Sequence, residues 1–262
     1  LTLARLGAAA WRSWADTLSL PDDADPYEAV LTPDAPSFLS TIEADGDNAP
    51  TTAAGYFSPR SGRAYWTRQP NVYYNRVLML HELTHLAHHR ARTASGRMPF
   101  WYAEGLAEHL SRHHWDGRCV TLGIRPLADQ EDLLAVALEE LPPRISEVPA
   151  WVDDDNFPSR ASVMAWWRFL ATASPDRDTF LAWQADADAG LVTFRSLPEA
   201  LDLSAQLDPL QDWLPTAQNA YTPVFSEWLH LTPTRIQGWG TFTTLLRRRG
   251  APPATFRVEH AT

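Results

Sequence analysis

The chain has 262 residues, of which 45% are hydrophobic, and its formal net charge is −10. This length allows one large domain, or one domain with a small appendage, and the apolar content is enough for a substantial core. The acidic charge excludes general nucleic-acid binding, which needs a basic surface. The single cysteine, Cys119, excludes a disulfide within the chain, and we expect it to be a small buried hydrophobic residue.

The first quarter of the chain predicts a helix, a loop and a β-hairpin. Apolar residues recur at helical spacing over residues 3–18. Residues 21–36 are rich in Pro and Asp and predict a loop with one short strand. Two β-prone runs, 53–57 and 63–67, flank a Pro- and Gly-containing turn and predict a hairpin.

The middle of the chain predicts a series of helices. The first begins near Asn71 or Asn75 and runs to near Ala94, where Gly96 ends it. Asp129 is the expected cap of a later helix, which Pro142 and Pro143 stop. Including that one, further helices are predicted over residues 100–113, 129–141, 160–172 and 179–189. No stretch approaches the ~20 apolar residues that a transmembrane segment requires.

The sequence pattern changes after about residue 205, where short β-prone runs alternate with Pro and Gly. We therefore predict a main α+β domain over residues 1–205 and a small β-rich C-terminal extension over 206–262, which is also interpretable as a truncated domain. Three tryptophans of this part are interpreted as structural, with a carbohydrate-stacking platform as the alternative: Trp213, Trp228 and Trp239. By contrast, four aromatic residues of the middle helices are predicted to lie in the core: Trp166, Trp167, Phe169 and Trp183.

The sequence His81-Glu82-Leu83-Thr84-His85 is the strongest functional signal. Two histidines four residues apart on a helix project from nearly one face, so their imidazoles can hold one zinc ion. The glutamate beside the first histidine is then placed to take a proton from the metal-bound water. These three residues predict the two histidine ligands and the general base of a zinc hydrolase.

A third ligand is predicted from the next helix, which contains Trp101-Tyr102-Ala103-Glu104-Gly105-Leu106-Ala107-Glu108. Glu104 follows His85 by 19 positions, and a helix packed across the first can direct its carboxylate to the same ion. Three protein ligands and a water form the open kind of zinc site that catalyses reactions. Glu108 lies one turn beyond Glu104 and can accept the remaining N–H of a ligand histidine.

This pair of motifs resembles the gluzincin peptidases, and within them the bacterial peptidase-MA-like group. That group has a G-[FY]-x-x-P hairpin before the zinc helix and a W-x-x-E-G-x-A-E segment after it; this chain has Gly55-Tyr56-Phe57-Ser58-Pro59 and the segment from Trp101 to Glu108. The resemblance is good over residues 50–115 and looser over 1–185. It implies a zincin-like fold, zinc bound by His81, His85 and Glu104, and Glu82 as general base and then general acid. It also implies that the strand near 63–67 is the edge strand that binds an extended peptide.

The chain departs from related families at several positions. Metzincins continue with a glycine and a third histidine, where this chain has His88 and Ala91. No G-x-M-E-N-like element precedes His81, so we favour an endopeptidase over an exopeptidase. Gluzincins stabilise the oxyanion with a Tyr or His, and here Arg160 stands near the expected position. Three tyrosines are alternative candidates for this role: Tyr65, Tyr73 and Tyr74.

The sequence thus predicts a zinc metallopeptidase acting on a peptide or protein substrate, and leaves the oligomeric state open. Two alternatives remain: a non-catalytic or impaired zinc protein that binds a glycan or a protein, with His88 or His109 as a fourth ligand, and a hydrolase of a non-peptide amide. The remaining histidines are expected to be exposed at helix ends rather than to form a second metal site: His88, His89, His109, His113 and His114. The start at Leu1, without methionine, and the resemblance favour an exported protein.

Overall fold

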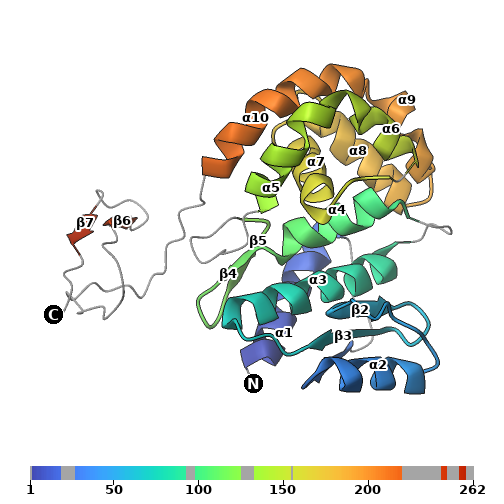
Figure 1. The fold of residues 1–262 in the computed structure, drawn as a ribbon, viewed down its shortest axis with the longest axis vertical. Helices are drawn as coiled ribbons and strands as arrows, with labels where there is room; N and C mark the ends of the chain where they lie inside the picture. The colour runs from blue at the N-terminus through green and yellow to red at the C-terminus, as the bar shows by residue number, and fades with distance from the viewer. Residues whose placement is uncertain are drawn as a thin grey trace. The chain divides into compact units, whose positions relative to one another are not determined.

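The computed structural model describes residues 2–18, 27–92, 98–124, 133–154, 156–219, 243–246 and 254–257. The chain divides into two compact units, Leu1–Tyr221 and Thr222–Thr262. The first unit is a mixed α+β structure, mostly helical with small sheets (Figure 1). None of its described helices combines the length and the apolar character needed to cross a bilayer.

A three-stranded sheet lies on one side of the first unit. Strands β2 (Gly55–Ser58) and β3 (Arg63–Thr67) form the predicted hairpin. Strand β1 (Glu28–Thr32) pairs in parallel with the other side of β3, which gives the order β1-β3-β2. The prediction that 63–67 is the edge strand is therefore wrong. Because β1 comes from the N-terminal segment and covers the free side of β3, β2 is the edge strand that lies nearer the histidine helix.

Helices cover both faces of this sheet. On one face, α2 (Ala35–Ala44) packs Phe38 and Ile42 against Tyr65 of β3. The sequence analysis did not predict this helix, although Asp34 caps it by accepting a hydrogen bond from the backbone N–H of Ser37. On the other face lies α3 (Val72–Ala91), which starts at the Asn71 cap as predicted and also contacts α1 (Thr2–Thr17).

Helix α4 (Phe100–Ser111) lies between α3 and α7 (Arg160–Thr172), and these three helices form the centre of the unit (Figure 1). Gly105 permits the close approach of α4 to α7, since a side-chain carbon there would lie 2.9 Å from the backbone oxygen of Val163. The aromatic residues predicted for the core are buried: Trp166, Trp167, Phe169 and Trp183. The sheet thus packs against one side of α3, and the α4–α7 pair packs against another side of it.

The remaining elements surround this centre. The chain leaves α4 through a short hairpin, β4 (His113–Trp115) and β5 (Val120–Leu122), so α4 ends before the predicted residue 113. Cys119 lies at the tip of this hairpin and is exposed, which corrects the prediction of a buried thiol. The other helices are α5 (Leu133–Glu140), α6 (Val148–Asp154), α8 (Arg177–Asp188), α9 (Leu197–Ala200) and α10 (Leu207–Asn219), with 3-10 turns at Pro142–Glu147, Phe194–Ser196 and Ser204–Gln206. Asp129, the predicted cap, lies outside the described residues.

The region after residue 205 begins with a helix that the sequence analysis did not predict. Helix α10 packs against α5 and α7, with Leu210 and Leu214 buried. Trp213 on this helix lies 5.7 Å from Phe169, measured between ring centroids, so it is part of the packing. In the second unit, β6 (Thr243–Leu246) pairs antiparallel with β7 (Ala254–Arg257). Trp228 and Trp239 lie outside the described residues, and the β-rich extension and its boundary stay predictions.

Candidate metal centre

Helix α3 presents His81 and His85 on one face. They are one helical turn apart, and their Nε2 atoms lie 3.1 Å from each other. His81 is 2% exposed, whereas His85 is half-buried and lines a pocket. The α-helical period alone therefore brings two nitrogen donors to one point, as the sequence predicted.

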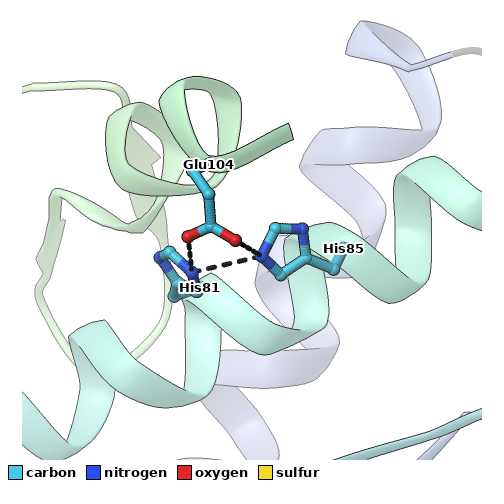
Figure 2. Close-up of side chains that lie close together, drawn as sticks. All are labelled: His81, His85 and Glu104. Carbon is cyan, nitrogen blue, oxygen red and sulfur yellow. Dashed lines mark hydrogen bonds and ion pairs between the residues drawn. The ribbon is translucent and has the colours of Figure 1, made fainter. Parts of the chain in front are cut away.

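Helix α4 adds the carboxylate of Glu104, which points between the two imidazoles (Figure 2). Its Oε2 atom lies 3.2 Å from Nε2 of His81, and its Oε1 atom lies 3.4 Å from Nε2 of His85. One ligand atom from each of the three residues lies within 4.8 Å of the others. Among the described residues, no fourth His, Cys, Asp or Glu joins this group. The arrangement is a buried His/His/Glu triad that can hold a metal ion.

The carboxylate of Glu104 itself indicates that an ion fits there. Its Oε2 atom is buried and lies 3.2 Å from Nε2 of His81 and 3.1 Å from Nη2 of Arg160, but it forms no well-aligned hydrogen bond with either. Buried polar atoms normally have such a partner, and an exception is typical of a site that binds an ion or water. Burial opposes the ionisation of Glu104, but the imidazoles of His81 and His85 outweigh it and lower the pKa of Glu104 well below its usual value. Two neutral nitrogen donors and one anionic oxygen donor suit a zinc ion.

Glu108 contacts His81 on the side of its ring that faces away from Glu104. Its Oε1 atom lies 3.4 Å from Nδ1 of His81, the ring nitrogen opposite the one that faces Glu104. Arg112, the residue that follows the last residue of α4, lies with its Nη2 atom 3.2 Å from the Oε2 atom of Glu108. Arg112 was not among the predicted site residues, although its spacing of four residues from Glu108 is a recognisable signal. These contacts can fix the ring orientation of His81 and leave its Nε2 atom to the metal.

Arg160, the first residue of α7, reaches both acidic residues of α4. Its Nη2 atom lies 3.1 Å from Glu104 and its Nη1 atom lies 3.4 Å from Glu108. Burial lowers the pKa of Arg160, but its carboxylate neighbours raise it by more, so the net pKa shift is upward. The side chain remains 51% exposed and lines the pocket beside Glu104. Arg160 therefore stabilises the negative charge of this centre.

Glu82 is buried next to the triad. Its side chain is 3% exposed, and burial raises its pKa to about 7. Gly55 of β2 lies directly against it, since a side-chain carbon at Gly55 would lie 2.9 Å from the carboxyl carbon of Glu82. The glycine that begins the G-[FY]-x-x-P segment is thus the residue that leaves room for this carboxylate.

A pocket of about 640 Å³ opens beside the triad. Glu82, His85 and Glu104 form part of its wall, so two residues of the triad and the adjacent acid face the same space. The rest of the wall comes from the β2 region, from α3 and α4, and from Arg160: Pro50, Ala53, Gly55, Tyr56, Phe57, Pro59, His89, Arg92, Met98, Phe100 and Ala103. A molecule in this pocket would contact the triad and the edge strand β2.

The histidines predicted to be exposed at helix ends differ in their surroundings. His88 is 2% exposed, and its Nε2 atom lies 2.7 Å from Asp188 of α8. His109 is also buried, with its ring 5.0 Å from the ring of Trp167 between centroids, and burial lowers its pKa to about 3. His113 is buried against Tyr73. The prediction of exposure is therefore wrong for these three, because α8, α7 and the start of α3 cover them. Neither His88 nor His109 belongs to the triad.

Two of the three tyrosines considered for oxyanion stabilisation are engaged elsewhere. The hydroxyl of Tyr65 donates to Asp45 on the far side of the sheet. The hydroxyl of Tyr73 accepts a hydrogen bond from the backbone N–H of His113. Tyr74 lies seven residues before His81, on the same face of α3, and is close enough to Arg160 to affect its pKa.

Comparison with known proteins gives no further identification. No protein-family model matches the chain, and no curated protein matches it. The functional interpretation therefore depends on the triad and its surroundings.

Proposed function

We propose that this chain is a zinc-dependent hydrolase of peptide bonds, with a zincin-like domain of the gluzincin type that resembles the peptidase-MA-like group. One observation carries the proposal: the His81/His85/Glu104 triad adjoins both a pocket and a buried glutamate. A three-ligand zinc site can accept a water or a substrate oxygen as its fourth ligand. A purely structural zinc site is usually closed by four protein ligands, and no fourth one is found among the described residues.

Glu82 is the proposed general base. When bound, zinc would polarise the substrate carbonyl and make water more acidic. Glu82 would take the proton of the attacking water and then deliver it to the leaving amine. Burial raises the pKa of this carboxyl to about 7, and a carboxyl with a raised pKa is a stronger base than an exposed glutamate. Glu108 would keep the ring of His81 oriented while this takes place.

The substrate would bind along β2. This strand lies at the edge of the sheet, lines the pocket through Gly55, Tyr56 and Phe57, and begins beside Glu82. An extended peptide can add to such an edge through backbone hydrogen bonds, which position its carbonyl without specifying its sequence. We therefore transfer the role first expected for strand β3 to strand β2. The apolar part of the pocket wall would accept side chains of the peptide.

Arg160 and Tyr74 are the proposed partners of the oxyanion. Arg160 lines the pocket and lies 3.1 Å from Glu104, so its charge acts on the same space as the metal. Tyr74 lies near it on the histidine face of α3. Positive charge directed at a developing oxyanion lowers the barrier to acyl transfer. Endopeptidase action is proposed because no acidic element for a substrate amino terminus precedes His81.

The test is the substitution Glu82→Gln in the zinc-loaded protein. It preserves the size of the side chain and removes its basicity, so the hydrolysis of a broad peptide library should fall at least ~100-fold. Zinc content should stay unchanged, because Glu82 is not a proposed ligand. Glu139→Gln, the same chemical change at an exposed residue of α5, should retain full activity. Equal hydrolysis by the Glu82 variant and the unmodified protein would contradict the assigned base. If the unmodified zinc-loaded protein cleaves no member of the library, the peptidase function itself is wrong.

A further inference from the structure

The pocket beside the triad extends along β2. Successive residues of a strand point to opposite faces of its sheet. Tyr56 packs on the α2 side, whereas Gly55 lies against Glu82 of α3. The ring of Phe57 lies 5.5 Å from the ring of His89, also on α3, measured between centroids. Gly55 and Phe57 therefore face the pocket together, and Phe57 follows Gly55 by about 7 Å along the strand.

Helix α4 forms another wall of the pocket with the same arrangement. Phe100, Ala103 and Glu104 line the pocket at the spacing of one helix face. Glu104 belongs to the triad, and Phe100 precedes it by one turn, about 6 Å along the helix axis. On α3, His89 likewise follows His85 by one turn. Since α4 follows α3 after a short connection, its first turn lies near the last turn of α3.

The strand and both helices thus lead from the metal to a second end of the pocket, about one helical turn away. We call it the aromatic end, and it is formed by Phe57, His89, Met98 and Phe100. Phe100 is 40% exposed, and of the four large apolar side chains with such exposure among the described residues, it is the one that lines the pocket. An exposed apolar surface inside a pocket is typical of a ligand-binding site.

The charges of the pocket lie elsewhere. The carboxylates of its described lining are those of Glu82 and Glu104, both at the metal end. Arg92 also borders the pocket, but its guanidinium lies over the ring of Phe194, 5.7 Å from the centroid. The pKa of His89 is lowered, first by burial and then by neighbouring positive charges, so its ring is neutral near neutral pH. Desolvation at the aromatic end therefore disfavours a charged side chain and favours an apolar one.

We propose that the aromatic end is a specificity subsite for a large apolar side chain of the substrate. In a peptide paired with β2, the residue opposite Gly55 has its bond at the metal. The residue opposite Phe57 comes two positions further, and its side chain points into the aromatic end. The preferred substrate is therefore a peptide with an aromatic or long aliphatic residue at the third position from the scissile bond.

This inference rests on the proposed function, because it assumes that a peptide lies along β2 with one of its bonds at the triad. It names a class of substrate that the triad itself does not determine. It also predicts an alternation along the peptide, since the residue between these two positions points to the opposite face, away from the pocket.

The test measures binding rather than cleavage. The zinc-loaded Glu82→Gln protein is titrated against fluorescent octapeptides, and the readout is fluorescence anisotropy. Two matched pairs carry Phe or Ala at the third position before, or the third position after, the central bond. In one pair the Phe peptide should bind about tenfold more tightly than the Ala peptide, as expected for the burial of most of an aromatic side chain. The same exchange at the second position on that side should have a smaller effect.

Phe100→Ser should remove most of this preference, and Phe100→Leu, which keeps a large apolar side chain, should retain it. Val72→Ser is the matched control, because Val72 is likewise an exposed apolar residue at the start of its helix but lies outside the pocket lining. The control should keep the full preference. Equal zinc content in all variants shows that the metal end is intact.

Three results would overturn the subsite: equal affinities in both peptide pairs, no binding of any peptide, or equal loss of the preference in the Val72 and Phe100 variants. The peptide pairs on the protein with an intact Phe100 decide the matter even if a variant does not fold. Cleavage of the peptide library by the unmodified protein tests the peptidase function separately.

Discussion

Two histidine groups on helix α3 lie within one turn of each other and have opposite surroundings. His81 and His85 face a carboxylate of α4 and a pocket. His88 faces Asp188 of α8, which also accepts a hydrogen bond from Tyr102, and both rings are buried. The same residue type on one helix thus contributes to a candidate metal centre on one side and to a buried polar contact on the other.

The comparison identifies what distinguishes a metal site from a structural contact. In the His88 group, one imidazole meets one carboxylate, whose second oxygen is bonded to Tyr102. In the triad, two imidazoles share one carboxylate, and Glu104 keeps a buried oxygen without a well-aligned hydrogen bond. The first group has one hydrogen-bond donor for each carboxylate oxygen, whereas in the second one ligand atom from each of three residues lies close enough to the others to bind a single cation.

Removal of the third proposed ligand, Glu104, should have the largest effect on zinc affinity. Glu104→Ala leaves two imidazoles, and the loss of the anionic donor should weaken zinc affinity by more than the ~10–100-fold typical of residues that only support a ligand. Zinc titration against a chromophoric chelator measures the change. Asp188→Ala, the equivalent change in the His88 group, should leave zinc affinity as it is. If both variants bound zinc as tightly as the unmodified protein, the triad would not be the metal site.

Substitution of Glu108 should have an intermediate effect on zinc affinity. Glu108→Gln keeps a hydrogen-bond acceptor near Nδ1 of His81 but removes the charge shared with Arg112 and Arg160. Zinc affinity should fall about 10-fold, at the lower end of the range for a residue that orients a ligand. The same chelator titration detects it. A loss as large as that of Glu104→Ala would instead mean that Glu108 binds the metal directly.

The His88 contact should affect stability alone. Asp188→Asn weakens a charge-assisted hydrogen bond to a buried ring and should lower the free energy of unfolding by about 1–3 kcal/mol. Urea unfolding of the metal-free protein measures this change, and zinc affinity should be unaffected. A variant with normal stability but reduced zinc affinity would reverse the roles that we assign to the two groups.

A third buried histidine, His109, should have a smaller effect on stability, and this effect depends on pH. Its pKa is lowered to about 3 in the folded protein by burial, and that of His113 to about 4, whereas an unfolded histidine has a pKa of about 6.5. The unfolded chain therefore binds the extra protons at these two positions, so their contribution to stability falls as the pH drops below about 6.5. Each group contributes a slope of up to about 1.4 kcal/mol per pH unit down to its folded pKa.

Urea unfolding of the metal-free protein between pH 7 and pH 5 measures this slope. His109→Gln should reduce it by one proton, and the further change His113→Gln should reduce it again. An unchanged slope in the first variant would show that His109 is not held neutral by its surroundings.

The triad was predictable from sequence, because its geometry follows from local periodicity. The helix period places His81 and His85 on one face, and the second motif supplies Glu104 from the next helix. The position of β2 at the edge of the sheet was not predictable in this way, since it depends on β1, which is distant in sequence, pairing with β3. The burial of His88 likewise depends on α8, 100 residues later in the chain. Contacts between distant segments leave no periodic signal in either partner.

Only part of the pocket beside the triad was predictable from the sequence. His89 and Arg92 were not predicted to line a pocket, although their spacing from His85 places them on its helix face. What the sequence analysis lacked was the path of β2, which decides which face of α3 borders a pocket. Arg160 was considered only as an oxyanion partner, and its ion pairs with Glu104 and Glu108 arise from the packing of α7 on α4.

The most direct test is X-ray absorption spectroscopy of the zinc-loaded protein, with the metal content measured on the same sample. We expect one zinc ion per chain, bound by two imidazole nitrogens at about 2.0–2.1 Å and by oxygen at about 2.0–2.2 Å. We also expect an exchangeable solvent ligand and loss of this spectrum in Glu104→Ala. A zinc ion closed by four protein ligands, or a spectrum that persists without Glu104, would contradict an open His/His/Glu centre.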